Sequence, residues 1–282
     1  MEFTIELLGT RAGVALRGVA PAGFPGREYG PFLAADGAAD VRLIVTVLPA
    51  AAGPGGDDLV RAHPAVGARY RRRGADELVW SWPHHLALYD PRGRVMEVYQ
   101  SELPGVLDVI EGYVRRLVGG RLARQGDLLL HGAGWLLDGA AAAAIGPSGA
   151  GKSTAARLMG PDFLLSGDVV AVADCAGAPA LHATPLGGAT DGAGSGPLRA
   201  LFFPRRADGF ALRPMARREA FARYWAEHWE YNFWYLRDEV GPVFENAHAL
   251  FARVPAYELA FAPDGIDRAA IGRLLGGRGE GA

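Results

Sequence analysis

The chain has 282 residues, of which 50% are hydrophobic and 21% are charged, and its formal net charge is −2 at pH 7. This length suits one large or two modest domains with a buried core. The nearly balanced charge argues against a nucleic-acid-binding protein, whose domain is usually basic.

The cysteine content and the hydropathy of the chain point to the compartment. The single cysteine, Cys175, excludes an internal disulfide and fits a reducing cytoplasm. The stretch Met1-Glu2-Phe3-Thr4 lacks the basic and apolar segments of a signal peptide. No apolar run approaches the roughly 18 residues of a membrane-spanning helix. We therefore expect a soluble cytoplasmic protein without membrane or nucleic-acid partners, and leave a homo-oligomer open.

Residues 1–103 are predicted to form a β-rich N-terminal accessory or recognition region. Four apolar segments bounded by turn residues are predicted strands: 41–48, 78–82, 85–89 and 94–99. Asp90-Pro91-Arg92-Gly93 is the predicted turn between the last two. The run Arg71-Arg72-Arg73 is expected to lie in a solvated turn.

Residues 104–282 form the second predicted region, which begins with a helix from Pro104. Ile110 and Val114 lie on its apolar face. Two apolar runs, 128–137 and 140–145, are then separated by Asp138-Gly139, a strong signal for a two-residue hairpin. The second strand is therefore expected to pair antiparallel with the first, whereas the commonest mononucleotide-binding folds place parallel neighbours there.

This second strand leads into a segment that matches the phosphate-loop pattern G-x-x-x-x-G-K-[ST]. Its glycines allow backbone N–H groups to surround an anion, and the following helix adds its positive end. Lys152 is the only lysine among 29 Lys and Arg residues, which indicates a place where a compact ammonium must reach the β- and γ-phosphates. We predict nucleoside triphosphate binding by Gly146, Ser148, Gly149, Ala150, Gly151, Lys152, Ser153 and Thr154.

Two oxygen-bearing residues are predicted to bind Mg²⁺. Ser153 follows the loop lysine. Asp168 comes at the end of a hydrophobic strand that begins at Phe163-Leu164-Leu165, shortly after the phosphate loop, and precedes the apolar run 169–173. The alternative for Asp168 is an ordinary turn residue. The glycine-rich stretch Gly187–Pro197 is either a mobile loop near the site or an inert linker.

Several of these segments together resemble HPr kinase/phosphorylase, and more closely its looser relatives found beside peptide-natural-product genes. They are His131-Gly132, the Asp138-Gly139 hairpin, 146–154, Ser166-Gly167-Asp168, 184–187, 198–204 and 254–259. The resemblance covers roughly residues 100 to 265. It implies an α/β fold with a mixed-sheet P-loop kinase domain, shared with phosphoenolpyruvate carboxykinase, that uses ATP and Mg²⁺.

The resemblance also implies roles for individual residues. His131 matches the family's active-site histidine, and Asp168 matches the second of two adjacent acids, the first of which is replaced here by Gly167. This replacement leaves open which group activates the acceptor hydroxyl. By its sequence position alone, His131 is either a proton acceptor near the phosphates or a structural group at a strand end. The family's signature and basic C-terminal motifs are not evident, which argues against HPr as the substrate and against an assured phosphorylase activity.

The leading expectation is a Mg²⁺-ATP-dependent kinase with His131, Lys152 and Asp168 as catalytic residues. Its acceptor is a hydroxyl, either a serine of a peptide or protein, such as a peptide natural-product precursor, or a small molecule. The alternative is a non-catalytic, nucleotide-dependent binding module. A transport-type ATPase is disfavoured, because the sequence lacks a Leu-Ser-Gly-Gly-Gln-like helix start and a later apolar strand ending in Asp-Glu.

Two further groups of side chains are open to two interpretations each. Arg199, Arg205 and Arg206 flank the apolar stretch 201–204 and either neutralise the transferring phosphoryl group or are solvated. The aromatic residues of the segment 217–240 form either a core-packing helix or a face that docks a peptide.

Overall fold

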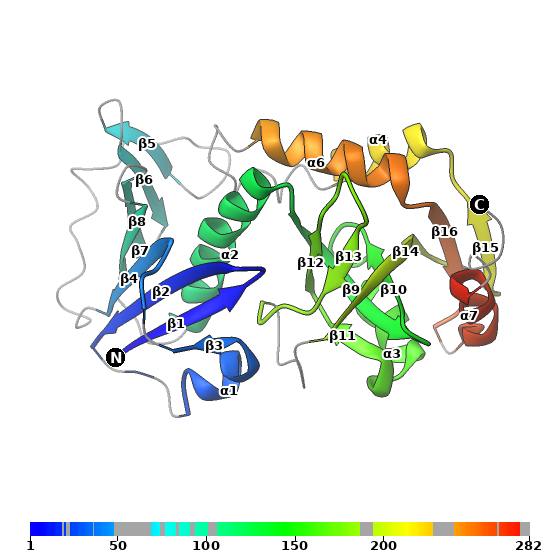
Figure 1. Ribbon diagram of the computed structural model, residues 1–282, viewed down its shortest axis with the longest axis horizontal. Helices are drawn as coiled ribbons and strands as arrows, with labels where there is room; N and C mark the ends of the chain where they lie inside the picture. Colours follow the sequence, from blue (N-terminus) through cyan, green and yellow to red (C-terminus); the bar gives the residue numbers. More distant parts are fainter. Residues whose placement is uncertain are drawn as a thin grey trace. The chain divides into compact units, whose positions relative to one another are not determined.

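The computed structural model has a mixed α/β fold with two mixed sheets and several helices (Figure 1). The structure describes residues 1–18, 20, 23–35, 37–47, 69–73, 77–82, 85–90, 94–100, 106–186, 194–227, 240–263 and 265–276. The chain divides into two compact units, Met1–Val118 and Gly119–Ala282. Within the described ranges, no helix combines the length and apolar character needed to cross a membrane.

The first unit contains a sheet of eight strands in the order β3-β1-β2-β4-β8-β7-β6-β5. The sheet is mixed, because β2 pairs parallel with β4 and β4 pairs parallel with β8, whereas its other pairs are antiparallel. The elements of this unit are β1 (Glu2–Leu7), β2 (Thr10–Arg17), α1 (Gly26–Tyr29), a 3-10 helix (Gly30–Phe32), β3 (Leu33–Ala34), β4 (Val41–Val47), β5 (Arg69–Arg73), β6 (Glu77–Trp82), β7 (His85–Asp90) and β8 (Val95–Gln100).

The four strands predicted in this region are confirmed as β4, β6, β7 and β8. The expectation for Arg71-Arg72-Arg73 is wrong, because these residues belong to β5 and pair with β6. Strands β1 and β2 were missed, although the alternating burial of β2 is typical of a half-buried strand. Residues 91–93 of the predicted turn lie outside the described residues.

Helix α2 (Val106–Gln125) continues across the boundary between the two units. The predicted division at 103/104 lies before this helix. As expected for the apolar face of the helix, Ile110 and Val114 are buried.

The second unit is built around another mixed sheet, in which β9 and β14 each pair with three other strands. The elements are β9 (Leu128–Leu137), β10 (Ala140–Ile145), α3 (Lys152–Met159), a 3-10 helix (Pro161–Phe163), β11 (Leu164–Ser166), β12 (Val169–Ala173), β13 (Ala180–His182), β14 (Ser195–Arg206), β15 (Ala211–Pro214), α4 (Arg217–Glu227), α6 (Val240–Arg253), β16 (Ala256–Phe261) and α7 (Arg268–Gly276). The strand order is β10-β9-β12-β13-β14-β16-β15, and an additional β10–β14 pairing closes a ring of strand pairs.

Strand β9 changes partner next to His131. Its first part pairs with β12, with Val169 opposite His131, and its second part pairs with β10, with Ile145 opposite Gly132. The parallel strands β10, β14 and β16 end at the same edge of the sheet. In open α/β sheets this carboxyl edge is where ligands bind.

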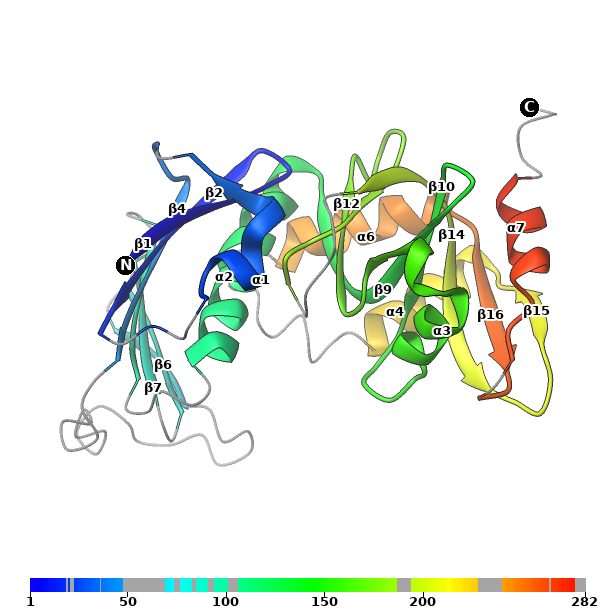
Figure 2. The same cartoon turned by 90° about the horizontal axis from the view of Figure 1, so that it is seen from below.

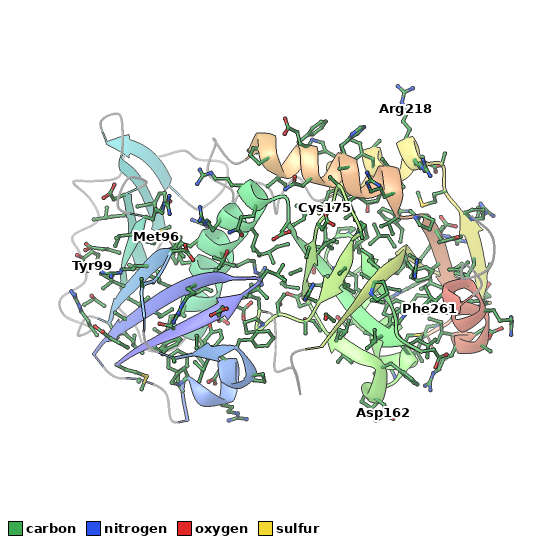
Figure 3. All side chains as sticks on the ribbon, viewed as in Figure 1. Met96, Tyr99, Asp162, Cys175, Arg218 and Phe261 are labelled. Atoms are coloured by element: carbon green, nitrogen blue, oxygen red, sulfur yellow. The ribbon has the colours of Figure 1, made fainter. Side chains whose placement is uncertain are left out.

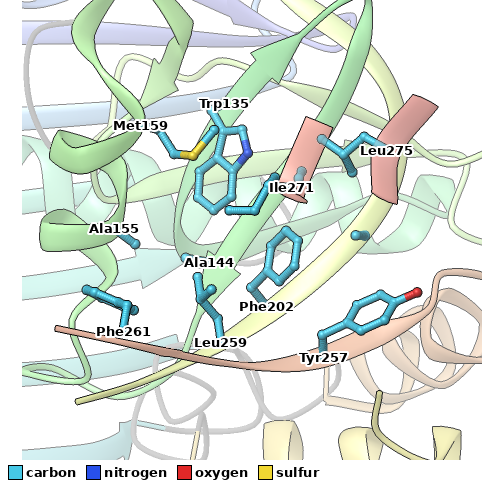
Figure 4. Packing of buried hydrophobic residues seen from close by; sticks show 12 residues of the cluster. Trp135, Ala144, Ala155, Met159, Phe202, Tyr257, Leu259, Phe261, Ile271 and Leu275 are labelled. Carbon is cyan, nitrogen blue, oxygen red and sulfur yellow. The ribbon is translucent and has the colours of Figure 1, made fainter. Parts of the chain in front are cut away.

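Helices cover both faces of the second sheet. Helix α3 lies on one side of the strands, and α4 and α6 lie on the other (Figures 1 and 2). On the α3 side, Trp135 and Phe202 stack with a centroid distance of 5.6 Å, next to Met159 of α3 and Ile271 of α7 (Figure 4). This apolar cluster determines which faces of β9, β10 and β14 are directed toward α3 and α7, and hence the position of the loop that follows β10.

We predict that Gly132→Ala destabilises the second unit. A Cβ at this position would lie 2.7 Å from the Ala144 carbonyl oxygen and 2.9 Å from Ile145 Cγ2, and the backbone oxygen cannot move without breaking the β9–β10 pairing. The expected loss is about 1–3 kcal/mol of unfolding free energy, typical of overpacking, measured by urea denaturation.

Gly167→Ala is the matched control for this substitution. A Cβ at residue 167 would meet no described heavy atom within 4 Å, so its stability should stay the same or rise slightly. Equal free energies of unfolding for Gly132→Ala and Gly167→Ala would contradict the prediction that a Cβ at residue 132 lies too close to its neighbours.

Candidate functional site

The predicted hairpin between β9 and β10 is confirmed, and it positions the phosphate loop. Asp138 and Gly139 have φ values of 50° and 79°, as a two-residue type I′ turn requires. The antiparallel register ends with Ile145 opposite Gly132. The loop therefore begins directly beyond this pair and beside His131.

The phosphate loop has the backbone shape that its glycines allow. Gly146, Gly149 and Gly151 have φ values of 146°, 79° and 102°, a region that L-residues with side chains rarely adopt. Helix α3 starts at Lys152, so its N-terminal end is directed into the loop. A Cβ added at Gly151 would lie 3.6 Å from Pro204 of β14 and 3.5 Å from Phe261 of β16, so the loop sits over the carboxyl edge of the sheet.

The remaining predicted loop residues differ in exposure. Ser148, Gly149 and Ser153 are exposed, whereas Ala150 and Thr154 are half-buried. The turn is closed by a 3.2 Å hydrogen bond from the Ala150 amide to the Pro147 carbonyl. The Ser153 hydroxyl is thus accessible at the first turn of α3, as a group expected to bind Mg²⁺ must be.

Lys152 is folded back onto its own loop. Its ammonium donates hydrogen bonds of 2.9 Å to the carbonyl oxygens of Gly146 and of Pro147, and the residue is only 5% exposed. Burial lowers the pKa of this ammonium, and the Asp168 carboxylate opposes the shift. Lys152 and Asp168 are therefore close enough to interact electrostatically.

His131 and Asp168 form a pair next to the loop. His131 Nε2 lies 3.0 Å from Asp168 Oδ1, and the Gly132 amide donates a 2.7 Å hydrogen bond to the Asp168 carbonyl. Because an ionised carboxylate only accepts hydrogen bonds, Nε2 carries the proton when Asp168 is charged. The other ring nitrogen, Nδ1, is buried.

The side chains of His131 and Asp168 differ in their exposure to solvent. The Asp168 side chain is 36% exposed and the His131 side chain 5%. When Asp168 is charged, Nε2 of His131 carries a proton and Nδ1 is buried, so neither ring nitrogen offers an accessible lone pair. Asp168 is the member of the pair that a ligand can reach.

Two buried hydroxyl groups fix the backbone that carries Asp168. Ser166 Oγ and Thr184 Oγ1 donate hydrogen bonds of 2.6 and 2.7 Å to the carbonyl oxygen of Val169. Both residues are fully buried. Residue 167 is in the middle of this anchored turn. A Cβ added there would meet no described heavy atom within 4 Å. The turn could therefore accept a side chain at the position of the family's first acid.

The predicted arginines are placed differently from one another. Arg205 Nε lies 3.0 Å from Glu258 Oε1, and Arg206 is exposed at the end of β14. Arg199 is exposed near the start of the same strand, remote from the carboxyl edge. The expectation of a loop extending to Pro197 is also wrong, because residues 195–197 pair with β13. Residues 187–193 lie outside the described residues.

Of the described aromatic residues of α4, Tyr224 belongs to the core, whereas Phe221 and Trp225 are only partly buried. Tyr224 is 2% exposed and its ring packs against Phe251 of α6 at 5.2 Å, and Phe221 contacts Phe244 at the same centroid distance. The rest of the aromatic segment, residues 228–239, lies outside the described residues.

Sequence reasoning missed Arg223 and Glu227, which α4 brings close to the loop. A Cβ added at Gly146 would lie 3.9 Å from Glu227 Oε2. Their spacing of four residues on an expected helix indicated a mutual contact. Nothing in the sequence indicated that the pair would lie beside the phosphate loop.

The residues of the site fit a magnesium nucleotide. The glycine loop and Lys152 suit the phosphates, while the Ser153 hydroxyl and the partly exposed Asp168 carboxylate are hard oxygen donors. In the described part of the chain, three or more His, Cys, Asp or Glu side chains do not gather into a metal site. Mg²⁺ does not need one, because it is usually held by one or two carboxylates, water and substrate phosphates.

Comparisons with known proteins do not assign the chain to a family. No protein-family model matches the sequence, and no curated protein matches it significantly.

We predict that Lys152→Ala lowers ATP affinity by at least about tenfold, because a charge-assisted hydrogen bond to phosphate is lost. Isothermal titration calorimetry with Mg²⁺-ATP measures the change. Arg157→Ala serves as the comparison, because it removes an exposed cation from the same helix outside the predicted loop residues. Unchanged ATP binding by Lys152→Ala would overturn the assignment of the phosphate loop.

Proposed function

We propose that this protein is a Mg²⁺-ATP-dependent kinase, with a P-loop kinase domain of the HPr kinase and phosphoenolpyruvate carboxykinase type, that phosphorylates a hydroxyl group. The observation that carries the proposal is the convergence of the phosphate loop with the His131–Asp168 pair. Asp168 is 3.0 Å from the histidine and within electrostatic reach of Lys152. A loop that binds triphosphate thus lies beside a partly exposed carboxylate.

The roles of the residues follow from their exposure and contacts. Lys152 and the loop amides bind the phosphates, and Ser153 and Asp168 are the groups that would hold Mg²⁺, which neutralises phosphate charge when bound. Asp168 accepts the proton of the acceptor hydroxyl. The hydroxyl oxygen forms a bond to the γ-phosphorus while the bond from phosphorus to the ADP oxygen breaks. His131 is a positioning residue that orients Asp168 through Nε2–H.

The resemblance to kinases found beside peptide-natural-product genes supports a serine of a peptide or protein as the acceptor. Incubation with ATP labelled at the γ-phosphoryl group, together with the products of neighbouring genes, tests this proposal. Transfer of the label supports it. Tight ATP binding without transfer to any acceptor favours a nucleotide-dependent binding module, which Gly167 in place of an acid also supports.

Asp168→Asn should lower kcat by about 100- to 10,000-fold, the usual contribution of a general base. Nucleotide affinity should change only a few-fold, since Lys152 and the loop amides remain. Label transfer and calorimetry separate the two effects. Adding Gly167→Asp to this variant should restore part of the activity, because it supplies a second carboxylate and a Cβ at residue 167 would meet no described heavy atom within 4 Å. Turnover close to that of the parent in Asp168→Asn would make Asp168 an ordinary turn residue.

Substitutions of His131 distinguish a positioning residue from a base. His131→Ala removes the hydrogen bond to Asp168 and should lower kcat by about 10- to 100-fold, as losing the support of a ligating carboxylate does. His131→Gln can still donate a hydrogen bond and should retain more activity than His131→Ala. Equal, complete loss of label transfer in the two folded variants would contradict the positioning role.

A further inference from the structure

An ion pair on α4 lies at the edge of the phosphate loop. Arg223 Nε donates a 2.7 Å hydrogen bond to Glu227 Oε1, and the two side chains are 30% and 26% exposed. Glu227 Oε2 is buried close to Gly146 and has no hydrogen-bond partner among the described residues. This pair approaches the loop from the face of the sheet opposite α3.

The guanidinium of Arg223 is also held by an aromatic ring. Its Cζ lies 4.9 Å from the centroid of Phe203, a residue of β14 with no exposed surface. Phe202 pairs with Ala144 of β10, so Phe203 stands level with the end of the strand that enters the loop. A buried ring and a carboxylate together reduce the freedom of the guanidinium beside Gly146.

The guanidinium of Arg223 has more N–H donors than its hydrogen bonds with the described residues use. A guanidinium has five N–H donors in a planar fork, and the Glu227 hydrogen bond engages one of them. The fork geometry matches phosphate oxygens, and partly buried charge–phosphate contacts are strong. Arg205, by contrast, is paired with Glu258.

We propose that Arg223 contacts the terminal phosphate of the bound nucleotide and that Glu227 and Phe203 are its positioning residues. The loop end beside them is the terminal-phosphate end, because the Lys152 ammonium, which reaches the β- and γ-phosphates, is bonded to the Gly146 carbonyl. During transfer, Arg223 stabilises the charge on the γ-phosphoryl oxygens. This inference rests on the proposed function.

If the Arg223–Glu227 ion pair only stabilised the helix, its loss would affect ATP and ADP binding equally. An i, i+4 ion pair on an exposed helix contributes about 0.3–0.5 kcal/mol to stability and has no preference between ATP and ADP. The ratio of the two nucleotide affinities is therefore the readout that separates a phosphate contact from helix stabilisation.

The experiment compares the Kd values of Mg²⁺-ATP and Mg²⁺-ADP for the full chain and four variants by calorimetry. Arg223→Ala should weaken ATP binding by about 10- to 100-fold and ADP binding by less than about threefold, as the loss of a charged phosphate contact predicts. Arg223→Lys keeps the charge without the fork and should be intermediate. Arg218→Ala is the matched control, since Arg218 is exposed on the same helix and points away from the sheet (Figure 3).

Glu227→Gln keeps the shape of the side chain without its charge, and should shift the ATP/ADP ratio in the same direction as Arg223→Ala but less. Thermal unfolding verifies that each variant is folded, and Arg223→Lys supplies the answer if Arg223→Ala is not. An unchanged ATP/ADP ratio in the folded Arg223 variants would overturn this inference alone. A parent protein that binds neither nucleotide would overturn the proposed function as well.

Discussion

The antiparallel pairing of Gly132 with Ile145 is the constraint on which the site depends. Because β10 ends at this pair, the phosphate loop must start beside His131, and because β9 then pairs with β12, Asp168 must follow on the other edge of β9. The strands approach so closely that a Cβ at residue 132 would contact the Ala144 carbonyl. A slip of one residue would turn every side chain of β9 to the opposite face and separate the histidine from its carboxylate.

This arrangement holds the side chains of the candidate site by backbone pairing and buried hydroxyls rather than by mobile side chains. The Asp168 carbonyl is bonded to the Gly132 amide, and the adjacent Val169 carbonyl accepts hydrogen bonds from Ser166 and Thr184. A site whose supporting groups are themselves fixed loses little energy to reorganisation when charge moves during a reaction. Lys152 is preorganised in the same way by two carbonyl oxygens of its own loop.

Local patterns made the loop and its hairpin predictable, because Asp138-Gly139 and the glycines around Lys152 specify their turns without distant partners. The contact between His131 and Asp168 was not predictable, since only the fold shows that Nε2 faces Asp168 and that Nδ1 is buried. Arg223 was missed for the same reason: α4 reaches the loop through packing of residues far apart in sequence. The strand at Arg71–Arg73 was missed because a run of three charged residues is typical of a solvated turn. These residues form a strand because they pair with β6, and the run itself does not indicate that pairing.

The chain has one lysine among its 29 lysine and arginine residues, and this composition has a chemical consequence. Lys152 carries the only ε-amine of the chain, so reagents that acylate primary amines have just this residue and the chain's α-amino group as targets. The amine is enclosed by the carbonyls of Gly146 and Pro147, and acylation at that residue therefore requires the loop to release it. A single mass increment on one peptide would thus report how often the loop opens, without any label having to be introduced.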